Sequence, residues 1–371
     1  MATTIEEIGR LVGCSSATVS RAMNRSGSVH PKTREAILRA VRETNYSAQP
    51  TGRRGRPSGV AARPLSRAVE ILYFRETSAR HLSLHTDHSD ADRFARNQDT
   101  DGSFYCRLIE GASAELLKCG FEGVLQTVTN ATSHKSITDV NRLDCAGVLV
   151  IGQETSAMDR FIERCTHPLM LVDIVRPGWS DAITTDNSAG ITLAFDHLYK
   201  MGHRRFGFAG RQDGVLAFTE RFTSFKWKLA EAGLPFTPGW IAEGPNRLDV
   251  IETSVARILA SESRPTAMLC ANDVAAFGAI RAANKAGLEV PTDLSIVGFG
   301  DDESAALVSP GLTTVRTPVH EIGRRSVRQL MLMIQNPVAV GQIGAQIRLT
   351  PELIVRQSTA APRVAWQAVS A

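Results

Sequence analysis

The sequence predicts an α/β body of two lobes, preceded by a small all-α head. From residue 69 onward, short apolar runs alternate with longer amphipathic stretches, whereas the first 46 residues show only helical periodicity. The 371 residues, 43% hydrophobic and 22% charged, suffice for two or three domains with cores of their own. The charge is divided in the same way, because residues 1–68 contain 12 Lys/Arg against 4 Asp/Glu while the whole chain carries only +4. A basic head on a mildly acidic body indicates that the head alone meets a polyanion.

The composition also excludes several classes of protein. No apolar run approaches the roughly 18 residues of a membrane span, and the polar first twenty residues lack the apolar stretch of a secretory signal. The six cysteines are scattered without a C-x-x-C pair, which favours free thiols in a reducing cytosol. The chain has no Gly-x-Ser-x-Gly elbow, Walker loop or His-Glu-x-x-His, and Gly298-Phe-Gly300 lacks the third glycine of a dinucleotide site. We therefore expect a cytoplasmic protein that is not an enzyme, with no cofactor and no membrane contact.

The head is predicted to contain three short helices. Thr4 can cap the first, whose apolar stripe consists of Ile5, Ile8, Leu11 and Val12. Gly13 supplies a turn, and a second helix is expected from Ser16 to about Met23. Pro31 suits the first position of a third helix that runs to about Thr44. Two helices joined by a tight glycine turn, with a third in support, form a helix-turn-helix that can enter the major groove of DNA.

This head resembles the DNA-binding head of the LacI/GalR (lactose-repressor/galactose-repressor) family. The resemblance rests on Ala17-Thr-Val-Ser-Arg21, Asn24, Lys32-Thr-Arg34 and Asn45-Tyr46. It implies that Ser16, Ala17 and Arg21 face base edges, with Arg21 reading a guanine through its two-pronged donor geometry. The DNA-binding residues expected in the head are Thr4, Ser15, Ser16, Ala17, Thr18, Ser20, Arg21, Asn24 and Tyr46.

The linker at residues 47–68 departs from the family, which usually has a hinge helix there. Five helix-breaking residues argue against a helix: Pro50, Gly52, Gly55, Pro57 and Gly59. Arg54-Gly-Arg-Pro57 is instead the core of an AT-hook, in which glycine lets the backbone enter a narrow minor groove and the arginines lie along its floor. We expect minor-groove contacts from Arg53, Arg54, Gly55, Arg56 and Pro57. The alternative is a flexible basic linker that touches phosphates nonspecifically.

The body is expected to form parallel sheets covered by helices on both faces, because short buried strands are joined by helical crossovers. The number of strands suits two Rossmann-like lobes, with a ligand site between them at the carboxyl ends of the strands. The expected strands are Val69–Phe74, Gly123–Val128, Gly147–Ile151, Leu169–Ile174, Arg205–Ala209, Ala267–Ala271 and Leu294–Gly298. The expected helices are Phe104–Lys118, Ala189–Met201, Phe218–Ala232 and Val274–Ala286.

The expected domain boundaries follow from these elements. Residues 1–46 form the head, 69–177 plus 312–337 the N-terminal lobe, 178–311 plus 338–358 the C-terminal lobe, and 359–371 a tail. The N-terminal lobe carries a polar insertion at 75–102. Its His81, His85 and His88 have a spacing that could place them on one helix face as a metal site. A solvated loop is the favoured interpretation, so no metal is expected.

The family resemblance continues to about residue 358, through motifs such as Thr185-Asp-Asn187 and Val297-Gly-Phe299. In the family, these lobes resemble periplasmic sugar-binding proteins and hold a small effector that changes lobe closure. The resemblance implies an effector site made by Phe104, Tyr105, Asp173, Arg221, Asn272 and Asp273, although Arg221 could instead form a surface salt bridge. Where the family usually has an aspartate after Gly-Phe, this chain has Gly300. Either Asp301 takes its place, or the cleft has lost a contact to ligand hydroxyls.

Together these expectations describe a sequence-specific DNA-binding transcriptional regulator on the bacterial nucleoid. We expect a repressor, although the sequence itself leaves the sign of regulation open. It would act as a homodimer, since the tail has no leucine heptad for a tetramer. The expected partners are a pseudo-palindromic operator with an A·T-rich centre and a sugar or related metabolite as effector. One alternative is an architectural minor-groove binder that ignores effectors. A sugar-binding protein without gene control is the other, and the basic head argues against it.

Overall fold

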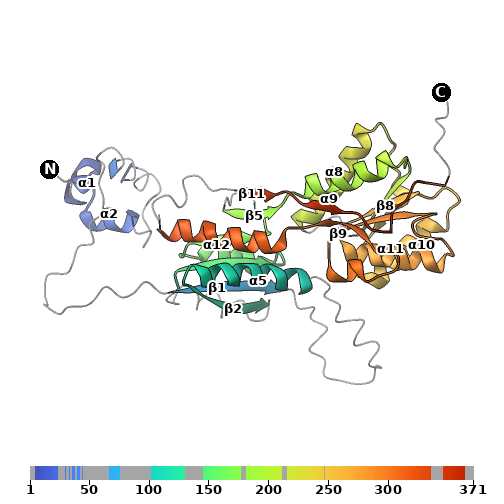
Figure 1. The fold of residues 1–371 in the computed structure, drawn as a ribbon. Helices are drawn as coiled ribbons and strands as arrows, with labels where there is room; N and C mark the ends of the chain where they lie inside the picture. Colours follow the sequence, from blue (N-terminus) through green and yellow to red (C-terminus); the bar gives the residue numbers. More distant parts are fainter. Residues whose placement is uncertain are drawn as a thin grey trace, which may run out of the picture. The chain divides into compact units, whose positions relative to one another are not determined.

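The protein is described from a computed structural model, in which the chain divides into two compact units, Met1–Pro64 and Leu65–Ala371 (Figure 1). The structure describes residues 5–23, 67–75, 102–129, 145–176, 181–210, 215–245, 247–335 and 346–363, together with 30, 33, 36, 37, 40, 41 and 44. The two units are described separately below.

The first unit contains the two helices predicted on either side of the glycine turn. They are α1 (Ile5–Val12) and α2 (Ser16–Met23). Gly13 between them has a φ of +68°, a conformation that glycine adopts without a steric cost. The small core that joins the helices consists of Ile8, Val19, Ala22, Ile37 and Ala40. Most of the expected third helix lies outside the described residues, but its Ile37 and Ala40 are buried in this core.

The N-terminal lobe of the second unit is a six-stranded parallel sheet in the order β11-β5-β4-β3-β1-β2. Helices α5 and α12 cover one face of the sheet, and α7 covers the other. The strands are β1 (Ala68–Arg75), β2 (Glu122–Thr129), β3 (Gly147–Gly152), β4 (Leu169–Val172), β5 (Ala182–Thr185) and β11 (Gln346–Leu349). The helices are α5 (Gly102–Lys118), α7 (Ser156–Arg164) and α12 (Val319–Gln335).

The C-terminal lobe has a second six-stranded sheet, in the order β12-β10-β9-β8-β6-β7, in which only β12 is antiparallel. Helices α8 and α9 pack on one face, and α10 and α11 on the other. The strands are β6 (Phe206–Gly210), β7 (Ile241–Glu243), β8 (Ala267–Cys270), β9 (Ser295–Gly300), β10 (Thr313–Arg316) and β12 (Glu352–Ile354). The helices are α8 (Asn187–Lys200), α9 (Leu216–Glu231), α10 (Leu248–Leu259) and α11 (Asp273–Lys285), with short 3-10 turns η2 (Pro238–Trp240) and η3 (Glu303–Ala306).

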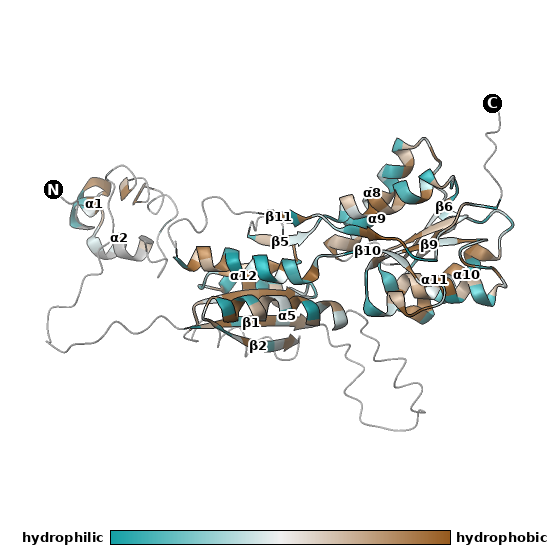
Figure 2. Ribbon diagram, in the orientation of Figure 1, coloured by the Kyte–Doolittle hydropathy of each residue, from teal (hydrophilic) through white to brown (hydrophobic). Residues whose placement is uncertain are grey.

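The fold of two α/β lobes matches the sequence prediction, and every predicted strand and helix of the body is present. The helices could be predicted because they are amphipathic. Figure 2 shows this for α10, α11 and α12, in which apolar and polar residues alternate along the ribbon. The expected lobe boundaries are wrong for three strands. The sequence places 182–185 and 346–349 in the C-terminal lobe, but β5 and β11 pair in the N-terminal sheet, while β10 belongs to the C-terminal sheet. Strands of four residues carry no pattern that tells which of two sheets they join.

The chain therefore passes between the lobes three times, after β5, after β10 and after β11. These crossings are adjacent. Asp186 N donates a hydrogen bond to Leu349 O across 2.9 Å, which joins the first crossing to the third. Arg316 lies opposite Glu352 in the β10–β12 pair, which joins the second to the third. The two lobes are thus connected by three neighbouring segments.

Helices α5 and α12 approach each other closely in the N-terminal lobe, and glycines permit the approach. A Cβ atom built on Gly323 would overlap the carbonyl oxygen of Leu108 and lie 2.8 Å from Ala112 N. A Cβ on Gly111 would overlap the carbonyl oxygen of His320 and lie 2.8 Å from its Cα. Each glycine therefore faces the backbone of the other helix, and no larger residue fits without moving a helix.

Candidate functional site

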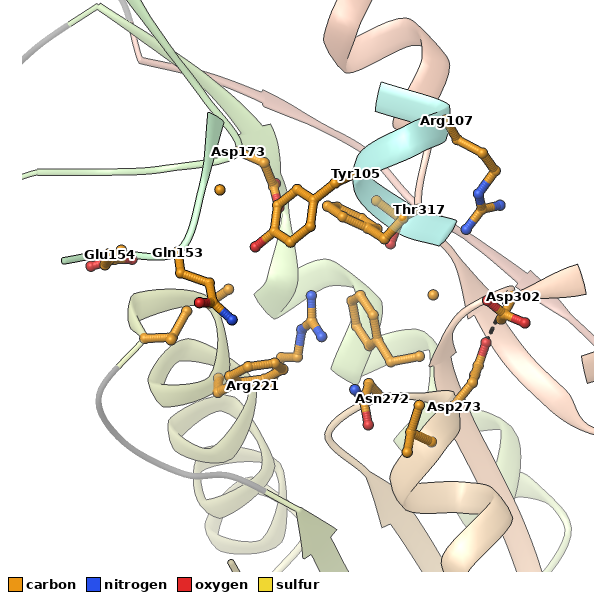
Figure 3. Close-up of a pocket in the computed structure, with 18 residues that line it drawn as sticks. Tyr105, Arg107, Gln153, Glu154, Asp173, Arg221, Asn272, Asp273, Asp302 and Thr317 are labelled. Atoms are coloured by element: carbon orange, nitrogen blue, oxygen red, sulfur yellow. Dashed lines mark hydrogen bonds between the residues drawn. The ribbon is translucent and has the colours of Figure 1, made fainter. Parts of the chain in front are cut away.

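A cavity of about 150 Å³ lies between the two lobes of the second unit (Figure 3). Its walls come from the carboxyl ends of the parallel strands and from the first turns of α5, α9 and α11. This is the place where open α/β sheets bind ligands. Six of the seven residues expected to contact an effector line the cavity: Phe104, Tyr105, Asp173, Arg221, Asn272 and Asp273. The seventh, Asp301, does not.

Arg221 projects from α9 into the centre of the cavity, toward Tyr105 and Asp173 (Figure 3). Only 7% of the residue is exposed, so its interpretation as a surface salt bridge is wrong. Its Nε donates to Asn187 Oδ1 at 2.8 Å and its Nη1 to Ala271 O at 2.7 Å. The guanidinium also stacks on the Phe299 ring, 3.7 Å from the centroid. The planar fork is therefore fixed in position before any ligand arrives.

Asp173 faces Arg221 from the end of β4 and has an unusual backbone conformation, with φ +57°. Aspartate tolerates this region better than most residues, but it costs of order 1 kcal/mol or more. Its Oδ1 accepts from Thr185 N at 3.4 Å. Burial raises the pKa of Asp173 to about 6, although the charge of Arg221 and the hydrogen bond from Thr185 act in the opposite direction.

Asp273 opens α11 and has both carboxylate oxygens occupied by the protein. Thr314 Oγ1 donates to Oδ1 at 2.5 Å, and Asp302 N donates to Oδ2 at 2.7 Å. Burial raises the pKa of Asp273 to about 6, while these two hydrogen bonds lower it. Gly298 leaves the space that the carboxylate occupies, since a Cβ there would overlap Oδ1. The preceding Asn272 caps the same helix, with Oδ1 accepting from Ala275 N at 3.0 Å.

Asp301 was the expected substitute for the family aspartate at Gly300, and the structure places it elsewhere. Its carboxylate accepts from Arg316 Nε and from Arg356 Nη2, each at 2.7 Å. These two guanidinium groups hold the pKa of Asp301 below its usual value, against the effect of burial. Asp302, one residue further, lines the cavity instead. The backbone explains why Asp302, and not Asp301, reaches the cavity, because Gly300 and Asp301 both have positive φ values, +133° and +52°.

Among the described residues, three side chains make contacts from one lobe to the other. Glu154, after β3, accepts from Leu216 N at the start of α9 at 3.3 Å and from Arg176 Nη1 at 3.1 Å. Arg107 Nη1 donates to Asp301 O at 3.2 Å. Arg348 on β11 donates to Glu220 on α9 at 2.8 Å. Opening the lobes would break all three, so they stabilise the closed arrangement.

The two buried aspartates predict a pH dependence of stability. Their folded pKa of about 6 lies above the roughly 3.9 of an unfolded aspartate. The folded state therefore binds these protons more tightly, and stability rises as the pH falls from 7 through 6. Asp173→Asn keeps the acceptor for Thr185 N and removes one titrating group. When the pH is lowered from 7 to 5, the free energy of unfolding of the variant should increase by about 1 kcal/mol less than that of the wild type. Urea unfolding at the two pH values measures the difference.

Asp249→Asn is the matched control for this experiment. Asp249 is exposed, and the hydrogen bond from Arg247 lowers its pKa, so it stays ionised throughout this range. Its replacement should leave the difference between pH 5 and pH 7 unchanged. An Asp173→Asn variant that follows the wild type across the same range would contradict a raised pKa at this position.

Comparison with known proteins places this arrangement in a family. Residues 4–49 match the profile of "Bacterial regulatory proteins, lacI family", and residues 195–359 match a "Periplasmic binding protein-like domain". The chain is 30% identical over 359 residues to the HTH-type transcriptional repressor PurR of Pasteurella multocida, covering 96% of this chain and 98% of the relative. The chain belongs to the LacI family. It is a DNA-binding transcriptional regulator, in which a LacI-type head is followed in sequence by a periplasmic-binding-protein-like domain.

Solved LacI-family structures share the fold along nearly the whole chain. The complex of the transcriptional regulator CelR with cellobiose superimposes with a TM-score of 0.65 at 23% identity, covering 96% of this chain and 99% of that one. The lac repressor dimer bound to operator and the anti-inducer ONPF gives a TM-score of 0.65 at 23% identity, covering 97% of this chain and 100% of that one. PurR of Haemophilus influenzae (strain PittEE) is 28% identical over 361 residues, 96% of this chain and 98% of the relative.

The LacI-type head presents part of its expected DNA-binding set in defined positions. Ser15, Ser16 and Thr18 lie at the start of α2, where Ser15 Oγ accepts from Thr18 N at 3.2 Å and caps the helix. Ala17, Ser20 and Arg21 are also on α2. Outside the described residues lie Thr4, Asn24, Tyr46, Arg53, Arg54, Gly55, Arg56 and Pro57, as does the histidine cluster of the insertion.

Sequence reasoning missed several cavity residues, among them Arg107, Gln153, Glu154, Phe218, Phe299, Asp302 and Thr317. Arg107 and Phe218 stand one turn from predicted site residues on the same helices, so helical spacing could have found them. Phe299 lies within β9, and the others come from the segments that follow strands, where no local pattern marks them. Within the described parts of the chain, no helix is long and apolar enough to cross a membrane, and no three His, Cys, Asp or Glu residues are grouped to hold a metal ion.

Proposed function

We propose that this LacI-family regulator is a homodimeric repressor whose operator affinity is changed by a small polar effector bound in the cavity around Arg221. The observation that carries the proposal is the buried Arg221 fork in a cavity built from both lobes. Paired donors on a planar group suit hydroxyl-rich or anionic ligands. A sugar or related metabolite fits this chemistry, and cellobiose occupies the related CelR.

The cavity offers a physical route from effector to DNA. A ligand changes an equilibrium only by its differential affinity for the two states. An effector held by Asp173 of the N-terminal lobe and by Arg221 and Asn272 of the C-terminal lobe favours the closed lobes, which the three lobe-to-lobe contacts also favour. In a homodimer, as in the related lac repressor, a change of lobe angle alters the spacing of two heads on a pseudo-palindromic operator. Lobe closure is thus converted into operator affinity.

The recognition helix provides the first test. Arg21→Ala removes the side chain expected to pair with a guanine, so affinity for a specific operator should fall about tenfold to a hundredfold. The operator is first obtained by random-site selection with the purified protein, and affinities are measured by fluorescence anisotropy at fixed salt. Binding to unrelated DNA should change little. Equal losses on operator and unrelated DNA would contradict a base-reading role for Arg21.

The linker provides a second test. If Arg54 and Arg56 occupy the minor groove, the Arg54→Ala, Arg56→Ala double variant should lose more affinity on operators with an A·T centre than on the same half-sites with a G·C centre. The comparison needs only two duplexes that differ at the centre. Equal losses on both duplexes would leave a nonspecific basic linker as the correct interpretation.

An architectural DNA binder that ignores effectors is the second candidate, and Gly300 favours it because the usual ligand-binding aspartate is missing. A thermal-shift panel of sugars separates the two functions. A regulator with a working cavity gains melting temperature from at least one ligand, whereas an effector-independent protein gains none.

A further inference from the structure

Arg107 lines the cavity, and none of the residues that the structure describes forms an ion pair with its guanidinium group. It lies on α5, one turn after Phe104, and Figure 3 shows it on the side of the cavity where Thr317 and Asp302 lie. Its Nη1 donates a hydrogen bond to a backbone oxygen, Asp301 O, at 3.2 Å. Among the same described residues, its buried Nε has no hydrogen-bond partner. A half-buried cation with unused donors costs free energy unless a ligand supplies acceptors.

Thr317 presents a second unused donor to the same cavity. It stands in the crossing between β10 and α12, with only 3% of its surface exposed. Its Oγ1 is buried and lacks a hydrogen-bond partner in the described part of the chain. A buried hydroxyl without a partner inside a cavity is explained most simply by a group that arrives with the ligand.

The acidic residues of the cavity, in contrast, are already engaged. Glu154 accepts from Leu216 N and Arg176, and Asp302 Oδ1 accepts from Ser304 N at 2.9 Å. Asp273 accepts two hydrogen bonds, and Asp173 faces Arg221. Near Arg107, the described residues therefore leave two buried groups without a hydrogen-bond partner, Arg107 Nε and Thr317 Oγ1, next to the single carboxylate of Asp302. The first turns of α5, α9 and α11 add the positive ends of three helix dipoles to the same walls.

We infer that the effector carries an oxyanion, a carboxylate or a phosphate, which Arg107 and Thr317 receive while Arg221 binds its hydroxyl groups. This inference rests on the proposed effector function and narrows it from sugars in general to sugar acids or sugar phosphates. Gly300 is consistent with it, because an aspartate side chain at this wall of the cavity would add negative charge beside an incoming anion. The cavity then has two parts, a hydroxyl-binding part at Arg221 and an anion-binding part at Arg107.

The test uses the full-length protein and matched ligand sets built on glucose, galactose and ribose, each as the neutral sugar, the sugar acid and the sugar phosphate. Melting temperature screens the panel, and isothermal titration calorimetry gives Kd for each member that binds. We expect one charged member to bind at least tenfold more tightly than its neutral counterpart. Whether the acid or the phosphate is preferred identifies the oxyanion.

Three variants assign the preference to its residues. Arg107→Gln should abolish the preference for the charged ligand, Arg107→Lys should retain part of it, and Thr317→Val should weaken it. Arg247→Gln, at an exposed arginine that pairs with Asp249, should retain the full preference. Neutral ligands that bind as tightly as charged ones, a preference that survives Arg107→Gln, or a panel without a charged binder would each overturn the inference. Binding of neutral sugars alone would leave the proposed function standing, whereas a panel without any binder would count against both.

Discussion

Arg221→Ala is expected to destabilise the second unit by about 3–5 kcal/mol, the range found when one partner of a buried charged network is removed. The truncation leaves Asn187 Oδ1 and Ala271 O without their donor, and Phe299 without the cation that stacks on it. It also removes the positive charge that lowers the pKa of Asp173. Urea unfolding followed by circular dichroism at pH 7 measures the loss. Part of it should be recovered at pH 5, where Asp173 is protonated.

Two further variants distinguish the hydrogen-bonding geometry of the Arg221 guanidinium group from its positive charge. Arg221→Lys keeps the positive charge but cannot donate to both acceptors in the same geometry, so it should recover only part of the lost stability. Arg257→Ala removes an exposed arginine from the last turn of α10 and should stay within about 0.5 kcal/mol of the wild type. A loss below about 1 kcal/mol for Arg221→Ala would show that its hydrogen bonds are replaceable by water.

Gly323→Ala should destabilise the N-terminal lobe by about 1–3 kcal/mol or more, because the added methyl group meets backbone atoms of α5. Leu108 O and Ala112 N belong to a helix and cannot rotate away as a side chain could. The two helices must separate, which loosens the core that they share with the sheet. Thermal and urea unfolding of the full chain measure the effect, and Gly111→Ala should produce a similar loss at the reciprocal contact.

Gly239→Ala is the control for this pair. No atom lies within 4 Å of a Cβ built there, and Gly239 is not among the glycines with positive φ. Its replacement should therefore be neutral or slightly stabilising, because alanine restricts the unfolded chain. If Gly323→Ala were as stable as Gly239→Ala, the two helices would not be in backbone contact.

The sequence predicted the lobes well because their elements carry strong local patterns. The apolar run of β3 and the amphipathic pattern of α5 can each be recognised from the residues of that element alone. Cavity residues such as Phe104, Arg221 and Asn272 could be named in advance because they stand in motifs that resemble those of the LacI/GalR family. The cavity was not predictable at Glu154 and Thr317, which reach the site only because crossings and loops bring distant segments together.

Asp301 is a single residue whose role could not be predicted from the sequence for the same reason. Its position in the sequence, directly after Gly300, fits a ligand contact as well as that of Asp302 does. The outcome depends on Arg316 and Arg356, which hold the Asp301 carboxylate from β10 and from the segment after β12. Such partners are distant in sequence, and only the folded sheet places them beside the loop.

The three neighbouring crossings have a mechanical consequence for the two lobes. A single connecting segment would allow the lobes to move in any direction. Three adjacent segments, joined by the contacts Asp186–Leu349 and Arg316–Glu352, restrict the lobes mainly to a rotation about one axis. Neither lobe is contiguous in sequence, so a proteolytic cut at any one crossing leaves the halves attached. We therefore expect a ligand in the cavity to act on the rotation of one lobe against the other about these three segments.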